Sequence, residues 1–415
     1  MSILFIIKSY NDIDHLTPII YGLLKLDQEP HIMFCSTVDY SSDYRICYLQ
    51  DNGLTNIHKL KRDECTVLKN KKNILTRLIA KVTKYDTIIG KIRRRYFLNC
   101  THEVGFLKAH NIHSVVFEWS TPSSNGFGVE RLFRAAKTIG CTTYSLPHGC
   151  NIYDHPDVNS GYVSASLRGI YLDEPDQRNM FDYYVFQGKT RRDICVKLGY
   201  DPIRTQAWGS VRFCPEWQKI NLEICPSVNM MNVKVGVFKV VFMDHQYDYN
   251  VNIQSIWESL ISISKIDNVH LVIKQSTREG KSEHILDYKD QLEELCNVDF
   301  VGSEVHSPRL IEWCDCVINY GSSIGIEAIL QDKPLIVPTF MHNNSTLFES
   351  YFSCHIANDI KEMLDILQGL ISGQLHNNFN PGKSEIINEI VYGGMGKHDV
   401  IDEYCTRLLS RKLLY

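Results

Sequence analysis

The sequence contains no run of about 20 consecutive apolar residues, so no segment is predicted to cross a membrane as a helix. The apolar run near its start is five residues long and is followed by a lysine, which is not the pattern of a secretory signal peptide. Basic residues are not in excess, because the formal net charge is −4. A general nucleic-acid-binding function is therefore not expected.

Cysteine pairs of the CxxC type are also missing, although the chain has 14 cysteines. The cysteines are scattered and several stand inside apolar runs, so we expect buried thiols in a reducing cytoplasm. Metal binding is the minor alternative, since no cysteine spacing matches a common zinc pattern. We therefore expect a cytoplasmic protein without a bound metal.

The sequence is rich in short apolar strands that alternate with helical stretches. Strands are expected at 3–7, 31–36, 86–90, 114–119, 142–146, 183–187 and 204–208, and again at 237–243, 269–274, 298–301, 315–320, 334–338 and 354–357. Buried strands that alternate with helices are typical of parallel sheets. Residues 211–236, which contain two prolines and show no clean period, separate the two sets. We predict an α/β fold in which two Rossmann-like domains face each other across a cleft.

A Gly-Ser-Ser turn stands where an apolar strand meets a helix, in the segment "VINYGSSIGIEAILQDKPLIVP" at 317–338. Free backbone N–H groups at a helix start, together with the hydroxyls of Ser322 and Ser323, favour an anion site for a nucleotide phosphate. Helix capping by the same serines is the alternative. Upstream, an apolar strand ends in Lys274, which with Arg278 would offer positive charge to a phosphate.

Three further side chains stand at the ends of predicted strands, where α/β proteins bind ligands. Glu118 is a candidate base for an acceptor hydroxyl, or else a packed strand-end residue. His148 precedes a glycine that permits a tight turn, and it is either a cleft residue or a structural histidine. Asp244 ends the first strand of the second half, and Asp248 competes with it for a catalytic role.

Residues 59–95 form a strongly basic segment, in which 13 Lys or Arg residues stand against three acidic residues. Apolar residues recur at helical spacing among these charges. A solvated basic helix face is the simpler interpretation. The alternative is a patch that contacts anionic lipid head groups or a phosphorylated acceptor.

Residues 310–328 resemble an element of the GT-B glycosyltransferases that build bacterial surface polysaccharides from nucleotide-activated acidic sugars or polyols. The matching residues are Leu310, Cys314, Asp315, Val317, Ile318, Asn319, Ser322, Ser323, Glu327 and Ala328. The chain looks like β-Kdo transferases and CDP-glycerol glycerophosphotransferases over residues 115–340. It departs from them after Lys274, where Gln275, Ser276 and Thr277 replace a His-Pro element.

The resemblance implies a GT-B fold. Its parts would be an acceptor-side domain at 1–210, a crossover at 211–236, a nucleotide-donor domain at 237–397 and a helix at 398–415 that packs back on the N-terminal domain. Gly209, just before the crossover, and Arg212, at its start, are interpreted as hinge residues.

The resemblance also implies roles for site residues. The donor phosphate would lie on Ser322 and Ser323, beside Gly321 and Glu327. Asp244 would be the nucleophile of a retaining mechanism. Glu118 or His148 would handle the acceptor proton.

The implied activity is a metal-independent glycosyltransferase of capsule or O-antigen assembly, which moves Kdo from CMP-Kdo to a glycan or lipid-linked glycan acceptor. No cofactor is expected beyond this nucleotide-sugar substrate. The expected location is the cytoplasm, with peripheral contact at the inner membrane through 59–95. The alternatives are a CDP-glycerol or ribitol-type polyol-phosphate transferase, and a catalytically inactive GT-B module that binds glycan.

Overall fold

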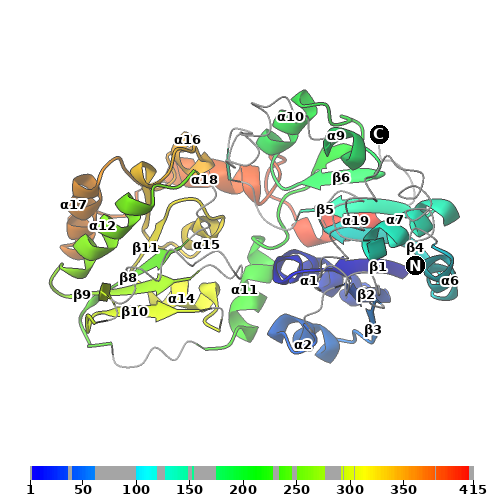
Figure 1. Cartoon of the computed structure of the whole chain (residues 1–415), viewed down its shortest axis with the longest axis horizontal. Helices are drawn as coiled ribbons and strands as arrows, with labels where there is room; N and C mark the ends of the chain where they lie inside the picture. Colours follow the sequence, from blue (N-terminus) through cyan, green and yellow to red (C-terminus); the bar gives the residue numbers. More distant parts are fainter. Residues whose placement is uncertain are drawn as a thin grey trace, which may run out of the picture.

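Two parallel β-sheets, each packed against helices, organise the chain (Figure 1). The computed structural model describes residues 2–35, 40–60, 100–118, 127–147, 152–153, 174–227, 233–244, 250–275, 291–292, 294–302, 304–378 and 380–410. Within these ranges the N-terminal sheet has seven strands and the C-terminal sheet has six. The predicted fold class, with two Rossmann-like domains, is confirmed.

The bounds of the elements are as follows. The N-terminal sheet contains β1 (Ser2–Ile7), β2 (Pro30–Phe34), β3 (Asn56–Lys59), β4 (Ile112–Glu118), β5 (Thr142–Leu146), β6 (Tyr183–Phe186) and β7 (Thr205–Ala207). Its helices are α1 (Tyr10–Lys25), α2 (Tyr44–Asp51), α6 (Thr101–Ala109), α7 (Phe127–Ile139), α9 (Glu174–Arg178) and α10 (Lys189–Lys197), and α11 (Pro215–Ile224) leads to the second domain. The C-terminal sheet contains β8 (Phe238–Met243), β9 (Val269–Lys274), β10 (Val298–Val301), β11 (Cys316–Asn319), β12 (Leu335–Pro338) and β13 (His355–Ala357). Its helices are α12 (Ile253–Ser264), α14 (Ser307–Trp313), α15 (Ile324–Leu330), the 3-10 helix η2 (Thr339–Met341), α16 (Leu347–Ser350), α17 (Ile360–Ile371) and α18 (Asn380–Ile390), and α19 (Val400–Leu409) ends the described chain.

Local sequence explains why these elements form. The central strands are continuous apolar runs, and Leu4, Phe5 and Ile6 of β1 are fully buried, as expected for strands covered on both faces. Helix α1 begins at a capping box, in which the side chains of Ser9 and Asp12 satisfy backbone N–H groups of the first turn.

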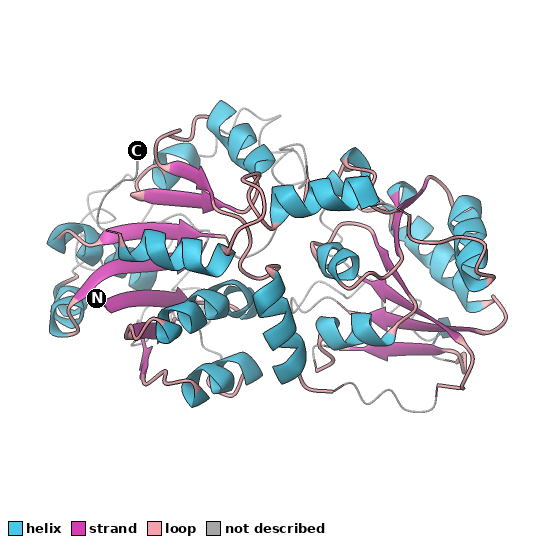
Figure 2. Ribbon diagram, turned by 180° about the vertical axis from the view of Figure 1, so that it is seen from behind, coloured by secondary structure: helices cyan, strands magenta, loops and turns pink. Residues whose placement is uncertain are grey.

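The order of strands places one switch point in each sheet. The N-terminal sheet runs β3-β2-β1-β4-β5-β6-β7, and the C-terminal sheet runs β10-β9-β8-β11-β12-β13, with parallel pairing throughout. The order reverses between β1 and β4 and between β8 and β11. Ligands of doubly wound folds bind at the carboxyl ends of strands at such points. The strand arrows of both domains point toward the middle of the molecule (Figure 2), so the two switch points face each other.

Helix α19 returns to the N-terminal domain and lies along α1. Gly22 permits the close approach, because a Cβ atom there would lie 2.4 Å from Cγ2 of Ile401 and 2.8 Å from Sγ of Cys405. The Tyr404 hydroxyl also donates a hydrogen bond of 2.9 Å to the carbonyl of Gly209. The last helix thus fastens the connection between the domains to the N-terminal sheet.

Several elements of the structure were not expected from the sequence, among them β3, α2 and α11, as well as the short helices α9, η2 and α16. Strand β3 was not predicted, because it is a polar edge strand whose residues stay partly exposed and so form no apolar run. Helix α2 was not predicted either, because its short sequence shows no clear helical spacing of apolar residues. Helix α11 lies inside the predicted crossover, and it begins at a proline and buries Trp217. The strand expected at 86–90 lies outside the described residues.

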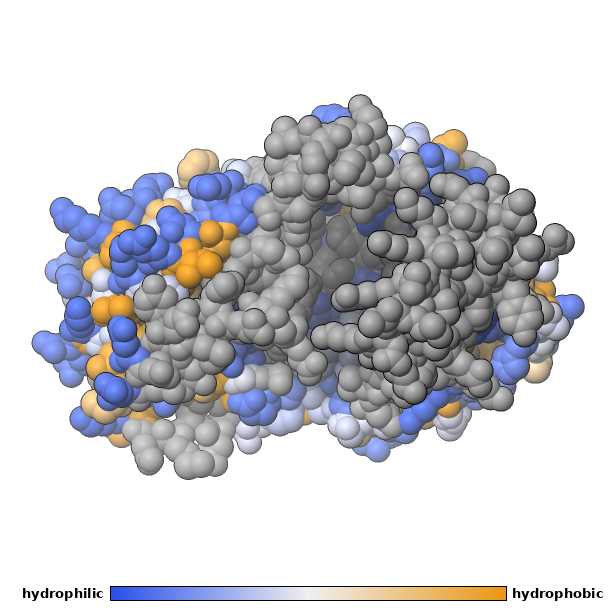
Figure 3. All heavy atoms as spheres, viewed as in Figure 1, coloured by the Kyte–Doolittle hydropathy of each residue, from blue (hydrophilic) through white to orange (hydrophobic). Residues whose placement is uncertain are grey.

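No helix in the described ranges is long and apolar enough to cross a membrane. In the view of Figure 3, the coloured surface is largely hydrophilic, with apolar side chains in small groups among the hydrophilic ones. Residues 61–95 lie outside the described part, so contact of this segment with a membrane stays a prediction.

The packing of α19 on α1 predicts opposite effects for two glycine substitutions. Gly22→Ala should lower the free energy of unfolding by about 1–3 kcal/mol, because the added methyl group overlaps Ile401 and Cys405. Gly105→Ala, in α6, should raise it by about 0.5–1 kcal/mol, because that Cβ meets nothing within 4 Å and alanine favours the helix. Urea unfolding of the two variants beside the parent chain measures both changes. Equal changes in the free energy of unfolding of the two variants would show that the close approach of α1 and α19 at Gly22 does not contribute to stability.

Candidate functional site

The switch point of the C-terminal sheet is marked by a buried carboxylate. Asp244 directly follows β8, is only 7% exposed, and accepts at Oδ1 a hydrogen bond of 3.0 Å from the Tyr320 hydroxyl. Tyr320 follows β11, so side chains join the ends of the two strands that flank the switch point. The structure therefore places Asp244 where ligands of this fold class bind.

The Gly-Ser-Ser turn follows β11 at the same edge. The Asn319 side chain holds it, accepting from the Ser322 N–H at 3.2 Å and donating to the Ser322 carbonyl at 2.8 Å. The Ser322 Oγ accepts from the Ile324 N–H at 3.3 Å, a local contact at the start of α15. The Gly321 carbonyl accepts a 3.0 Å hydrogen bond from Tyr153 of the N-terminal half. Phosphate binding at Gly321–Ser323 stays a prediction.

Lys274 ends β9, next to β8 at the same edge. Its side chain is buried, and Nζ donates a hydrogen bond of 2.5 Å to the carbonyl of Gly302. Burial lowers the pKa of the Lys274 ammonium to about 8, although the nearby Glu304 carboxylate opposes that change. The structure therefore holds a cation that is costly to bury at the sheet edge where the sequence predicts an anion site.

The N-terminal switch point carries a second buried carboxylate. Glu118 ends β4 and forms an ion pair with Lys8, which directly follows β1. Both side chains are largely buried, at 9% and 15% exposed. The ion pair joins the strands that flank this switch point, as the Asp244–Tyr320 hydrogen bond does in the other sheet.

A buried ion network links the two domains. Arg212, between β7 and α11, donates to Oε1 of Glu327 from Nε at 3.1 Å and from Nη2 at 2.7 Å. Its Nη1 also lies 3.3 Å from Oδ2 of Asp14 on α1. Asp14 pairs in turn with Arg45 of α2, which also holds Asp43 at 2.7 Å. The carboxylate predicted to contact the donor is therefore already engaged by an arginine.

The environment of Glu327 makes this pairing necessary. Its side chain is 1% exposed, and burial raises the pKa of the carboxyl, whereas the Arg212 charge opposes that change. Removal of the arginine would leave a buried carboxylate without a partner, which costs several kcal/mol.

An aromatic contact beside the network also spans the domains. The Tyr10 hydroxyl lies 3.2 Å from Nδ1 of His306, which precedes α14, and the Tyr44 ring packs edge-on against the same imidazole at 4.8 Å. Burial raises the pKa of Tyr10 to about 12 and lowers that of His306. A neutral phenol therefore meets a neutral imidazole at neutral pH.

Several of these residues were missed from the sequence. Lys8 stands directly after an apolar strand, so the rule that selected Glu118 could have selected it too. Tyr320 follows a strand in the same way. Asp14 and Arg45 lie on helices, and no local pattern predicts their pairing. Arg212 was interpreted as a hinge, whereas its guanidinium carries the contact between the domains.

Two predicted site residues, His148 and Arg278, lie outside the described residues. The structure brings Asp244, Lys274 and Gly321–Ser323 to one sheet edge and Glu118 to the edge of the other sheet. Their catalytic and phosphate-binding roles stay predictions.

Comparison with known proteins gives information on the fold. No family model matches the sequence, and no curated protein shows significant similarity to it. UDP-GlcNAc 2-epimerase from Neisseria meningitidis bound to UDP-GlcNAc is similar with a TM-score of 0.64 at 10% identity, over 99% of this chain and 100% of that chain. UDP-GlcNAc 2-epimerase from Methanocaldococcus jannaschii, in complex with UDP-GlcNAc and UDP, has a TM-score of 0.56 at 13% identity, over 94% and 99%. Anabaena HepE in complex with UDP-glucose has a TM-score of 0.56 at 12% identity, over 98% of both chains.

These similarities confirm the GT-B type of architecture and correct the predicted activity. Transfer of Kdo from CMP-Kdo, with the polyol-phosphate and inactive-module alternatives, is contradicted because many of the matched structures are UDP-GlcNAc 2-epimerases. The residues of 310–328 that suggested a Kdo transferase therefore indicate the fold and not the reaction.

The interdomain network predicts a large loss of stability when its central arginine is removed. Arg212→Met should lower the free energy of unfolding by roughly 3–5 kcal/mol, because Glu327 stays buried without its partner. Lys25→Met is the matched control, since it breaks the exposed pair with Glu216 and should cost about 0–1 kcal/mol. Chemical unfolding followed by circular dichroism measures both, and similar losses would contradict the role given to Arg212.

Proposed function

We propose that this chain is an enzyme that binds a nucleoside-diphosphate sugar between its two domains and inverts the configuration of one carbon of that sugar. The observation that carries the proposal is the pair of buried carboxylates, Glu118 and Asp244, one at each of two facing switch points. The ligands of similar structures, UDP-GlcNAc and UDP-glucose, support a uridine nucleotide as the first candidate.

Inversion at a carbon requires one group that removes a proton and another that returns a proton to the opposite face. Two carboxylates from opposite domains suit this task, because a sugar held between them exposes one face to each. Lys8 forms an ion pair with Glu118 and so holds this carboxylate at the end of β4. The Tyr320 hydroxyl donates to Asp244 and fixes the direction of its carboxylate.

The C–H bond next to the anomeric carbon breaks most readily when its electron pair displaces the nucleotide phosphate from that carbon. The departing diphosphate then carries more negative charge, which a buried cation stabilises. Lys274 supplies such a cation at the edge that also carries Asp244 and the Gly-Ser-Ser turn. Return of the diphosphate to the anomeric carbon, with a proton on the opposite face, completes the inversion.

Solvent deuterium tests the reaction. The full chain is incubated with UDP-GlcNAc in D₂O and followed by NMR, and we expect a new UDP-sugar epimer with deuterium at the inverted carbon. Glu118→Gln and Asp244→Asn should each reduce this exchange by at least about a hundredfold, because each removes a proton-transfer group. Asp332→Asn, whose side chain is 81% exposed, is the control and should keep full exchange.

The outcome separates isomerisation from other chemistry. UDP-GlcNAc that binds but never exchanges deuterium, or that is only cleaved to UDP and free sugar, would overturn the proposed reaction. Full exchange in both carboxylate variants would overturn the roles of Glu118 and Asp244.

The pKa of Lys274 predicts how nucleotide binding depends on pH. The ammonium loses its proton as the pH rises through about 8, so its attraction for a diphosphate is present below that pH and lost above it. Affinity for UDP should fall by about tenfold between pH 7 and pH 9, in titration calorimetry. Lys274→Arg should flatten this dependence, because a guanidinium stays protonated over the whole range. An unchanged pH profile in the variant would argue against contact between Lys274 and the diphosphate.

A further inference from the structure

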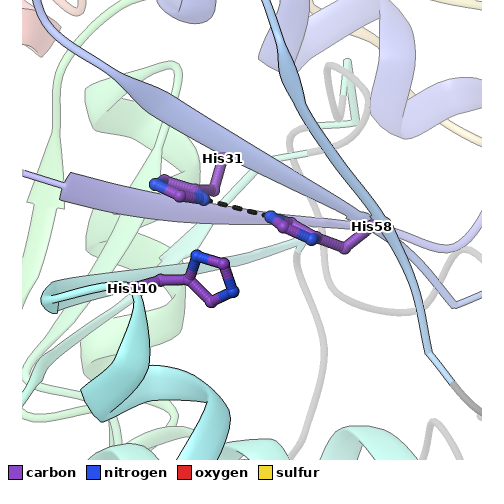
Figure 4. Close-up of side chains that lie close together, drawn as sticks. All are labelled: His31, His58 and His110. Carbon is purple, nitrogen blue, oxygen red and sulfur yellow. Dashed lines mark hydrogen bonds between the residues drawn. The ribbon is translucent and has the colours of Figure 1, made fainter.

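Three histidines meet beside the edge strand β3 of the N-terminal sheet (Figure 4). His31 is the second residue of β2, His58 lies in β3, and His110 directly follows α6. One ring nitrogen of each lies within 4.8 Å of the others. Figure 4 shows the three rings gathered between the strands and the helix end. The cluster lies near the amino-terminal ends of β2 and β4, whereas the switch points lie at the carboxyl ends.

We propose that this cluster binds a divalent transition-metal ion, with Zn²⁺ as the expected ion, through three imidazole nitrogens and a water molecule. The Nδ1 atom of His31 lies 3.1 Å from the Nε2 atom of His58. Two nitrogen ligands of a tetrahedral zinc ion, each about 2.0–2.1 Å from the metal, lie about 3.3 Å apart. This pair therefore already has the spacing of two ligands, and a ring nitrogen of His110 lies within 4.8 Å of both as the third.

The backbone and the neighbouring rings hold the ligands in place. The parallel register of β2 and β3 pairs His31 with Asn56 and Met33 with His58, so both histidines point to the same face of the sheet. The Phe106 ring packs against His58 at 4.9 Å and against His110 at 4.6 Å, which limits the rotation of both imidazoles. The site is thus preorganised by packing.

Burial and electrostatics suit a cation with one open position. His31 is 4% exposed, whereas His58 and His110 are half-buried, so solvent reaches one side of the cluster. The carbonyl end of α6 lies next to His110, and the negative end of a helix dipole favours a cation.

A hydrogen bond between His31 and His58 without metal is the competing explanation. It accounts for the 3.1 Å contact, but it gives no reason for the third imidazole to stand in reach of the same point. A bound ion would fasten the edge strand β3 and the end of α6 to β2. Because the cluster lies beside the edge strand β3 and not at a switch point, its role would be structural and not catalytic.

Metal content and thermal stability of the full chain test the proposal. The protein is stripped with EDTA, supplied with one or two equivalents of ZnCl₂, desalted and measured by elemental mass spectrometry, with MgCl₂ as the contrasting ion. We expect one tightly held zinc per chain and a rise in melting temperature with Zn²⁺ but not with Mg²⁺. His58→Gln and His110→Gln should each weaken zinc binding by more than about tenfold and remove that rise.

The control and the contrary results are equally specific. His102→Gln changes an exposed histidine of the same helix and should keep both the zinc and the melting-temperature shift. Two ligand variants are used, each checked by circular dichroism, so that misfolding of one does not decide the result. Zinc content and melting-temperature shift equal to those of the parent in both ligand variants would overturn the proposal, as would a parent chain that retains no zinc.

Discussion

The buried ion pair between Arg212 and Glu327 is the constraint on which the arrangement of the two domains depends. Each charge costs several kcal/mol to remove from water. The Arg212 guanidinium offsets that cost for Glu327, and Glu327 together with Asp14 offsets it for Arg212. Asp14 and Arg45 extend the pair into the helices that follow β1 and β2. The carboxyl ends of the two sheets are therefore held facing each other, and a ligand at either edge lies near the other domain.

Within that frame the sheet order decides where chemistry can occur. A reversal of strand order leaves the ends of two neighbouring strands uncovered by a connecting helix, and both domains fill this position with a buried carboxylate and a partner from the adjacent strand. Lys8 holds Glu118 in one sheet, and Tyr320 holds Asp244 in the other. The similarity between the two edges arises from topology, since the partners differ in residue type and in charge.

Much of this arrangement follows from local patterns in the sequence. Apolar strands that alternate with helices predict both parallel sheets, and residues at strand ends predict the edges that carry Glu118, Asp244 and Lys274. The pairings do not follow, because Lys8 and Glu118 are 110 residues apart and Tyr320 and Asp244 are 76 apart. Strand β3 was not predicted for a different reason. An edge strand exposed to water needs no apolar run, so its sequence resembles that of a loop.

The same distinction explains why a good motif match predicted the wrong activity. Leu310, Cys314 and Val317, which carry much of the match, are fully buried and serve the packing of α14 and β11. Glu327 is held by Arg212, so it too contributes to the joining of the domains. A motif composed of such residues describes how a strand and a helix pack together in this fold. The edges that carry Glu118 and Asp244 belong to different domains, and no contiguous segment of the sequence contains both.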